Sequence, residues 1–271
     1  MRTARQISSF GLPLRALLPS TSVGSSSINA LPSRRAASTA APAKPTIVDL
    51  TRPLKHRSLC HPFHPHFVMT KWDTHQPMVA GEATFRSSSY YISMSDHAGT
   101  HIDAPKHFDP APGALSIDQM PLTDFYTEGI CLDLSHAELR AGITVPEMEE
   151  ALKKSDQEIK QGDTVLLFNK RVSCEDPRWQ HDFPGLVPES VHWLADKGCK
   201  IFGVEAVSPA PEGELNFLAH NICGERSITH IEGLDNLESL LGKGRFRFIG
   251  FPLKFVEGSG SPIRAVALFD N

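Results

Sequence analysis

The stretch SDHAGTHIDAPKHF, residues 95–108, concentrates side chains of the kinds that bind metals, namely His97, His101, Asp103 and His107. Two β-branched residues and Pro105 disfavour a helix here, so we expect an extended or looped segment. Alternate side chains of an extended chain share one face, which places His101, Asp103 and, if the chain stays extended, His107 on the same side. Gly99 permits a tight turn that brings His97 to the same point.

Three imidazoles and a carboxylate that converge on one side favour zinc, manganese or a similar divalent ion. Magnesium and calcium would require more oxygen ligands. The alternative is a loop of surface histidines, which is the usual explanation of any single histidine. The clustering argues against it, because eight of the chain's 13 histidines lie between His56 and His107.

The pattern of apolar residues predicts a chain of alternating strands and helices. Strands are expected within residues 46–54, 83–94, 129–135, 163–169, 199–207, 227–232, 246–255 and 264–270. Helices are expected at residues 144–155, 189–197 and 234–241, the first with a capping box formed by Thr144 and Glu147. The strand–helix–strand order from residue 163 to 207 implies a βαβ unit with a right-handed crossover. We therefore expect one α/β domain over residues 46–271.

The first 45 residues have the composition of an organellar transit peptide. They are rich in arginine, serine and alanine, and no acidic residue precedes Asp49. The opening MRTARQISSFGLPLRALL mixes arginine with leucine and phenylalanine, as an amphipathic targeting helix does. We therefore expect import into the mitochondrial matrix; if residues 1–45 are an untargeted disordered tail, a cytoplasmic protein is expected instead.

The rest of the composition argues against several function classes. A net charge of −4, with no dense Lys/Arg stripe beyond the N-terminal segment, gives no reason to expect nucleic acid as a partner. No apolar run approaches the roughly 18 residues of a membrane-spanning helix, so no membrane partner is expected. Five widely spaced cysteines without a Cys-x-x-Cys pair indicate free thiols in a reducing compartment. The Gly-x-Ser-x-Gly elbow of serine hydrolases and the glycine-rich nucleotide-binding loops are both missing from the sequence.

HAGTHIDAPKHF resembles the signature His-x-Gly-Thr-His-x-Asp-x-Pro-x-His of the cyclase family of metal-dependent hydrolases, which includes the bacterial-type kynurenine formamidases and the isatin hydrolases. Farther along the chain, Glu232 follows His220 by twelve residues, which is the spacing of the family's second metal-binding element. The closing FIGFPLKFVEGSGSPIRAVALF is similar to the family's C-terminal phrase. The resemblance therefore covers about residues 46–269.

This resemblance implies the family's swivelling β/α-type fold, a single domain with a mixed sheet. It also implies one or two divalent metals, zinc first and manganese second, held by His97, His101, Asp103, His220 and Glu232. Asp103 and Glu232 would bridge a two-metal site, and His107 would be the general acid/base rather than a ligand. Because family members are commonly dimers or tetramers, a homodimer or homotetramer is expected.

The reaction implied by the resemblance is hydrolysis of an amide of a small aromatic compound. N-formylkynurenine, giving kynurenine and formate, is the first expectation. Opening of a cyclic amide, as isatin hydrolases perform, and hydrolysis or cyclisation of another carbonyl compound are alternatives. An alternative of another class is a metal-binding relative without catalysis, acting as a regulatory or assembly subunit. The complete signature argues against it, because sequence drift would be expected to reach His107 first.

Two segments depart from the family pattern. LLFNKRVSCEDPRW stands where formamidase-like members often have a Thr-Gly-Trp-like turn, and VSPAPEGE keeps Ser208 without the acid beside it. Both would lie near the substrate, so they leave its identity open. The histidines of CHPFHPHF (His61, His64 and His66) are either extra ligands or part of a loop that covers the site. His230 would share a strand face with Glu232 and support the site or pack, rather than bind metal.

Overall fold

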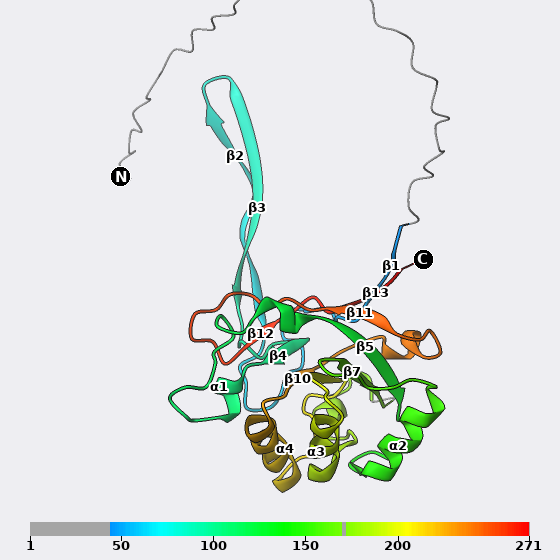
Figure 1. The fold of residues 1–271 in the computed structure, drawn as a ribbon. Helices are drawn as coiled ribbons and strands as arrows, with labels where there is room; N and C mark the ends of the chain where they lie inside the picture. Colours follow the sequence, from blue (N-terminus) through cyan, green and yellow to red (C-terminus); the bar gives the residue numbers. More distant parts are fainter. Residues whose placement is uncertain (1–43, 170–171, 271) are drawn as a thin grey trace, which may run out of the picture. The chain divides into compact units, whose positions relative to one another are not determined.

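The computed structural model describes residues 44–169 and 172–270 (Figure 1). Its strands are β1 (Thr46–Asp49), β2 (Val68–Ala80), β3 (Ala83–Ser93), β4 (His101–Asp103), β5 (Tyr126–Asp133), β6 (Gly142–Ile143), β7 (Thr164–Phe168), β8 (Gly185–Leu186), β9 (Ile201–Val204), β10 (Thr229–Glu232), β11 (Phe246–Ile249), β12 (Gly260–Pro262) and β13 (Val266–Phe269). Its helices are α1 (Pro105–Phe108), α2 (Val145–Lys154), α3 (Pro188–Asp196) and α4 (Glu214–Arg226), with short 3₁₀ turns η1 (Leu122–Phe125), η2 (Pro177–Gln180) and η3 (Leu237–Leu240).

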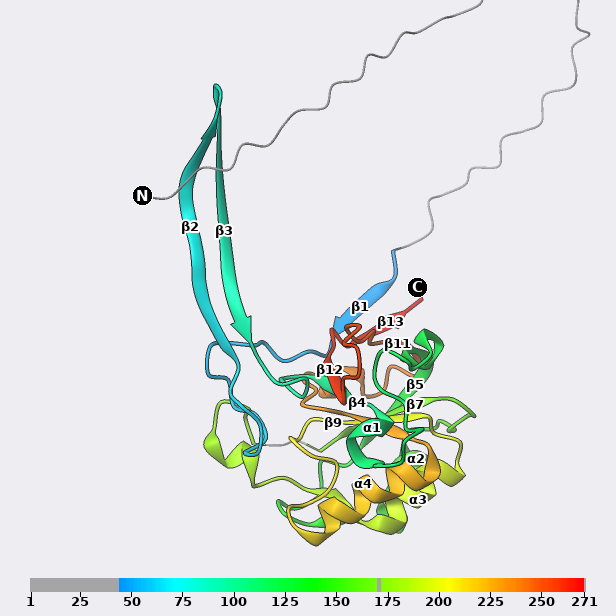
Figure 2. The same cartoon turned by 90° about the vertical axis from the view of Figure 1, so that its left-hand side faces the viewer.

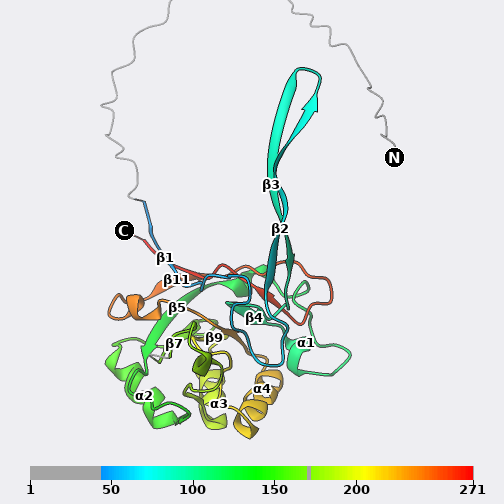
Figure 3. The ribbon, with the colours of Figure 1, turned by 180° about the vertical axis from the view of Figure 1, so that it is seen from behind.

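One mixed sheet of nine strands organises the domain, in the order β1-β13-β11-β5-β7-β9-β10-β4-β12. The central strands β5, β7, β9 and β10 are parallel, and the strands on either side of them pair antiparallel. Each parallel step is joined through a helix, and α2, α3 and α4 lie together on one face of the sheet (Figure 3). The α/β fold with a mixed sheet and βαβ units is therefore confirmed.

The central strands are buried on both faces. On β7, Val165 and Leu167 belong to the core under the helices, whereas Leu166 and Phe168 belong to the core on the opposite face. A strand in this position needs apolar side chains at every residue, which is why DTVLLFN predicts a buried strand. The helices contribute Met148, Val191, Leu194 and Ile222 to the first core.

The predicted capping box also forms. The backbone N–H of Thr144 donates to the carboxylate of Glu147 at 2.8 Å, immediately before α2. This bond satisfies a donor that no helical carbonyl can reach, so it fixes where the helix begins.

Local patterns missed several elements, including the short strands β6, β8 and β12, and overestimated one. Helix α4 was not predicted because its apolar residues are spread around it: Ala219 is buried, whereas Phe217 is 63% exposed. Strand β2 was not predicted because Pro77 and two register shifts interrupt its pairing with β3. The helix expected at residues 234–241 is only the turn η3, which begins after Asn236 in a left-handed conformation (φ 60°).

Strands β2 and β3 form a separate hairpin, residues 68–93, which we call the arm (Figure 2). Within the described chain, neither of its strands pairs with the nine-stranded sheet. Most of its residues are exposed along both strands. The arm therefore adds nothing to either core, although its two ends lead directly into segments of the site described below.

The remaining sequence predictions concern the N-terminal segment, the cysteines and membrane-spanning helices. The transit segment, residues 1–45, lies almost wholly outside the described residues and stays a prediction. All five cysteines are free thiols, as their spacing predicts, and four of them are buried. Among the helices of residues 44–169 and 172–270, none has the length and apolar character needed to cross a membrane.

Candidate active site

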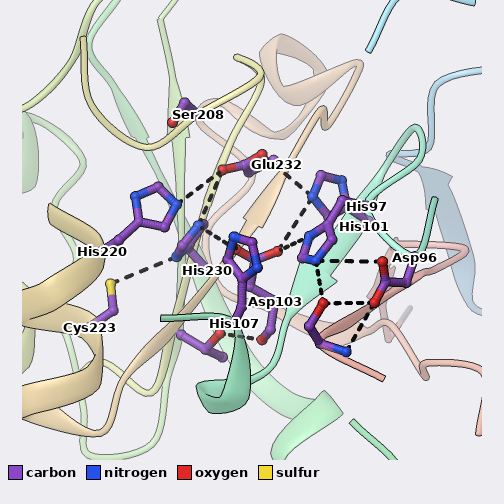
Figure 4. Close-up of polar contacts among 12 residues, drawn as sticks. Asp96, His97, His101, Asp103, His107, Ser208, His220, Cys223, His230 and Glu232 are labelled. Carbon is purple, nitrogen blue, oxygen red and sulfur yellow. Dashed lines mark hydrogen bonds and ion pairs between the residues drawn. The ribbon is translucent and has the colours of Figure 1, made fainter. Parts of the chain in front are cut away.

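Two neighbouring strands bring the main donors together (Figure 4). β4 and β10 pair antiparallel, and their register places His101 directly opposite Glu232. Facing residues of paired strands project on the same side of a sheet, so Asp103 joins them two residues farther along. Gly99 has φ 70°, which reverses the chain before β4. As a result, Nδ1 of His97 lies 2.8 Å from Oδ1 of Asp103.

His107 reaches the site on a helical turn. Ala104 is extended (φ −93°, ψ 155°), but Pro105 then begins α1. Proline suits the first helical position, because its fixed φ matches the helix and its missing N–H has no partner there. The expectation of an extended or looped segment up to residue 108 was therefore wrong beyond Ala104. The turn nevertheless brings Nε2 of His107 to 3.7 Å from Oδ2 of Asp103.

His220 enters from α4, more than a hundred residues after β4. Its Nδ1 lies 2.8 Å from the carbonyl oxygen of Asn216, one turn earlier in the helix. A carbonyl only accepts, so Nδ1 carries the proton and Nε2 is left with a lone pair. Nε2 lies 4.0 Å from Oε1 of Glu232. The hydrogen bond to Asn216 is the kind of outer contact that orients a metal-binding imidazole. The fold thus brings together the five residues that the sequence assigned as ligands.

His101 gives the clearest indication that the site binds a cation. Its Nδ1 lies 3.0 Å from the carbonyl oxygen of Gly99, so this nitrogen is the protonated one. Its buried Nε2 has no hydrogen-bond partner in the described structure. This lone pair lies 3.4 Å from Oδ1 of Asp103 and 3.4 Å from Oε2 of Glu232. A buried lone pair that faces two carboxylate oxygens is unfavourable, and a divalent metal would bind all three atoms.

The orientation of His97 is fixed from the opposite side of its ring. Nε2 lies 2.9 Å from Oγ of Ser259, and this hydroxyl donates to Oδ2 of Asp96 at 2.8 Å. Because the hydroxyl proton is engaged by Asp96, the Ser259 oxygen accepts from Nε2 of His97, which turns Nδ1 toward Asp103. Gly260 is required beside it, since a Cβ there would lie 2.7 Å from Cε1 of His97.

We expect Ser259→Ala to weaken metal binding without removing a ligand. Loss of the hydroxyl leaves Nε2 of His97 without its acceptor, and such outer-sphere changes typically cost 10–100-fold in metal affinity, about the range expected here. Competition with a chelator of known affinity measures the effect. Ser239→Ala, which removes a hydroxyl bonded to the carbonyl of Asn236 on an exposed turn, is the matched control. Equal affinities for the two variants would contradict the role of Ser259.

The two carboxylates of the site are buried, and His230 lies between them. The side chains of Asp103 and Glu232 are 1% and 8% exposed, and Nε2 of His230 is 3.2 Å from an oxygen of each. Burial disfavours a charged His230, yet the Asp103 carboxylate raises its pKa well above the usual value. Burial likewise opposes ionisation of Asp103, but His230 and His97 lower the pKa of that carboxyl well below its usual range. Ionised buried carboxylates require nearby positive charge, so the donor set fits a divalent metal.

His107 differs from the other imidazoles of the site. Its side chain is 29% exposed, and no hydrogen bond to its ring occurs among the described residues. Burial lowers the pKa of His107 to about 4. Repulsion from His97 and His220 adds to this shift, and the Asp103 carboxylate opposes it. With this pKa, the ring of His107 is neutral at neutral pH. A neutral imidazole with a free nitrogen is a proton acceptor.

A cavity of about 430 Å³ opens onto these groups. The loop His61–His64 forms part of its wall, and the ring of His64 stacks on that of His97 with centroids 5.0 Å apart. The CHPFHPHF segment therefore covers the site, as the second of its two sequence interpretations expects. Apolar walls come from three phenylalanines and polar ones from a serine and two asparagines: Phe63, Phe108, Phe217, Ser208, Asn216 and Asn221.

Some functional contacts were missed by sequence reasoning. Asp96 and Ser259 were assigned no role, because their contact joins residues 163 positions apart. His230 was expected to support the site or pack, and its contacts with both carboxylates agree with support. Trp179 is 2% exposed and packs in the core.

Comparison with known proteins agrees with the site. The family model described as "Putative cyclase" matches residues 48–211. The kynurenine formamidase of Salinibacter ruber is 30% identical over 175 residues, which are 65% of this chain and 77% of that protein. The kynurenine formamidase of Paracidovorax citrulli is 27% identical over 213 residues, 72% of this chain and 94% of that protein.

Solved structures show the same fold. Isatin hydrolase A from Labrenzia aggregata has a TM-score of 0.70 at 23% identity, covering 84% of this chain and 94% of its own. An isatin hydrolase bound to the product analogue thioisatinate has a TM-score of 0.72 at 22% identity, covering 84% and 93%. The family match spans the complete histidine motif that lies at the centre of the site. The chain therefore belongs to the cyclase family, as its motif predicts.

Proposed function

We propose that this protein is a metal-dependent amidohydrolase whose substrate is N-formylkynurenine. The observation that carries the proposal is the buried Nε2 lone pair of His101, which has no hydrogen-bond donor and lies 3.4 Å from one carboxylate oxygen of Asp103 and 3.4 Å from one of Glu232. A divalent ion completes such a site. The curated relatives named kynurenine formamidases, at 26–30% identity, support an amide of this kind as the substrate.

The residues proposed to hold the metal are those that the family resemblance implies: His97, His101, Asp103, His220 and Glu232. Their mixture of imidazole nitrogens and carboxylate oxygens suits zinc, with manganese as the alternative, and the two carboxylates allow one ion or two. When bound, a divalent ion supplies a lowered pKa for water and polarisation of the carbonyl. His230 would keep both carboxylates oriented by hydrogen bonds at 3.2 Å.

His107 is proposed to move the proton. Its neutral ring accepts a proton at Nε2 as the water oxygen bonds to the formyl carbon, and returns it to the anilide nitrogen as the carbon–nitrogen bond breaks. The products are formic acid, which releases a proton to give formate, and the free aromatic amine, so atoms and protons balance without a covalent enzyme intermediate. His107 lines the cavity and its side chain is 29% exposed, so both the attacking water and the leaving nitrogen would have access to it.

The cavity also offers complementary walls for an aromatic amide. The rings of Phe108 and Phe217 would contact the aryl group and exclude water from the reacting bond. Asn216 and Asn221 would face the polar side chain of the substrate, because amide groups pair with both carboxylate and ammonium. Ser208 is held by Asn216, to whose Oδ1 its hydroxyl donates at 2.5 Å.

The full chain, purified and measured with N-formylkynurenine and isatin, tests the proposal. We expect stoichiometric divalent metal by elemental analysis, hydrolysis of N-formylkynurenine, loss of at least about 100-fold in rate with chelator, and recovery when metal is restored. Protein without metal, or hydrolysis indifferent to chelator, would overturn the metal-hydrolase proposal. If the protein opens isatin and leaves N-formylkynurenine intact, the proposed substrate is wrong and a cyclic amide takes its place. Bound metal with no turnover of any amide would favour the non-catalytic alternative.

A further inference from the structure

The four oxygens of the two buried carboxylates divide between two sides of the site. On the first side, Oδ1 of Asp103 and Oε2 of Glu232 each lie 3.4 Å from Nε2 of His101. On the second side, Oδ2 of Asp103 and Oε1 of Glu232 each lie 3.2 Å from Nε2 of His230 (Figure 4). Each carboxylate oxygen has lone pairs for an ion, so the imidazole on each side decides whether an ion can lie there.

Two imidazoles of the site are oriented by a carbonyl oxygen at their far ring nitrogen. Nδ1 of His101 lies 3.0 Å from the carbonyl oxygen of Gly99, and Nδ1 of His220 lies 2.8 Å from that of Asn216. Each carbonyl accepts from the ring N–H, so each Nε2 keeps a lone pair. Metal-binding histidines almost always donate their other N–H to an oxygen in this way.

His230 has no such oxygen at its far nitrogen. Its Nδ1 lies 3.7 Å from Sγ of Cys223, which is its one hydrogen-bonding neighbour among the described residues. Both side chains are 0% exposed, so solvent does not supply an acceptor. The rings of Phe202 and Phe108 stack on the imidazole with centroids 5.4 and 6.0 Å away, which holds its orientation. Because a thiol is only a weak acceptor, it does not fix the ring proton at Nδ1 as a carbonyl does.

Nε2 of His230 therefore carries a proton. It is hydrogen-bonded to Oε1 of Glu232 and paired with Oδ2 of Asp103, both at 3.2 Å, and carboxylate oxygens only accept. A nitrogen that carries a proton offers no lone pair to a metal. The other imidazoles on this side, His107 and His220, lie 3.7 and 4.0 Å from these oxygens. Two imidazoles are fewer than the three protein ligands that zinc keeps even in catalytic sites.

We propose that His230 occupies the second side of the site, so that the protein binds one divalent ion per chain rather than two. His230 is a positioning residue: it holds one oxygen of each carboxylate and leaves the other oxygen, beside Nε2 of His101, for the ion. The inference rests on the proposed function, because it takes the site to bind metal, and it decides between the one or two ions that the carboxylates allow.

The metal content of the full wild-type chain is the first test. After saturation with Mn²⁺ and gel filtration, we expect elemental analysis to give one ion per chain. Electron paramagnetic resonance should show isolated Mn²⁺, because two ions in one site lie about 3.5–4 Å apart and would couple magnetically. Two ions per wild-type chain would overturn this inference and leave the metal-hydrolase proposal standing, whereas no bound ion would overturn both.

His230→Ala tests whether His230 excludes the second ion. The substitution frees Oδ2 of Asp103 and Oε1 of Glu232, so we expect the metal content to double to two ions per chain, with the spectrum of a coupled Mn²⁺ pair. His230→Gln is the conservative variant, because its amide N–H can donate to the same oxygens, and it should keep one ion. His136→Ala, which removes a 51% exposed imidazole, is the control and should also keep one.

The remaining outcomes contradict the inference in different ways. A single ion in folded His230→Ala would mean that His230 does not exclude the second ion. Two ions in the wild-type chain and one in His230→Ala would make His230 a metal ligand. If circular dichroism shows that His230→Ala does not fold, His230→Ser, which leaves a hydroxyl in the space of the ring, provides the same count.

Discussion

Asp103→Asn is expected to abolish metal binding and hydrolysis together. Asp103 is buried at the centre of the site, where imidazole nitrogens of His97, His101 and His230 lie within 3.4 Å of its two oxygens. The substitution keeps the shape of the side chain but removes the charge that offsets a bound cation. We expect metal affinity to fall by at least about 100-fold, beyond the range typical of outer-sphere changes, and hydrolysis to fall to the level of the metal-free protein.

Elemental analysis after gel filtration and the rate of amide hydrolysis measure this effect. Asp196→Asn is the matched control, because that carboxylate is 67% exposed and pairs with Arg226 at the surface. The control should retain metal and rate. If Asp103→Asn retained stoichiometric metal, Asp103 would have to be removed from the ligand set, and the lone pair of His101 would need another explanation.

His107→Gln is expected to separate catalysis from metal binding. The ring of His107 is the most exposed of the imidazoles around Asp103, and its Nε2 is 3.7 Å from the carboxylate, beyond hydrogen-bond distance. Its pKa, lowered to about 4, keeps it neutral and able to accept a proton at neutral pH. Loss of a general acid/base typically lowers the rate by 10²–10⁴-fold, so we expect a decrease of about that size with metal content unchanged.

The control for this substitution is His136→Gln, which removes a 51% exposed imidazole that faces Glu147 at 3.6 Å. It should leave both metal content and rate unchanged. His107, Asp103 and His97 are themselves close enough to hold an ion together. Loss of metal in His107→Gln would therefore identify His107 as a ligand, and the proton would need a different acceptor.

The sequence predicted those features that depend on residues close together in the chain. Four donors within residues 97–107 indicate a divalent metal, because the turn at Gly99 and the extended segment up to Asp103 put His97, His101 and Asp103 on one side. His107 joins them on the helical turn α1. The buried run of β7, the capping box of α2 and the βαβ order are equally local, and all three are confirmed. Pro105 was interpreted too strictly, since proline disfavours the interior of a helix but suits its first position.

Other features could not be predicted from local patterns. The family resemblance assigned His220 and Glu232, but no pattern within α4 shows that it is a helix, because both of its faces mix polar and apolar residues. The antiparallel register of β4 and β10, which sets His101 against Glu232, depends on pairing between strands about 130 residues apart. The contact of Asp96 with Ser259, which orients His97, likewise joins residues that are far apart in the chain.

The sequence by itself thus determined the family, the α/β class and the residues able to bind metal, because these are properties of residue type and spacing. Only the tertiary structure decided which nitrogen of each histidine faces the carboxylates, that His107 is neutral, and that the arm is exposed. A lone pair is fixed by the hydrogen bond at the other nitrogen of the ring, and a pKa by burial and neighbouring charge. Both depend on groups that only folding brings into contact.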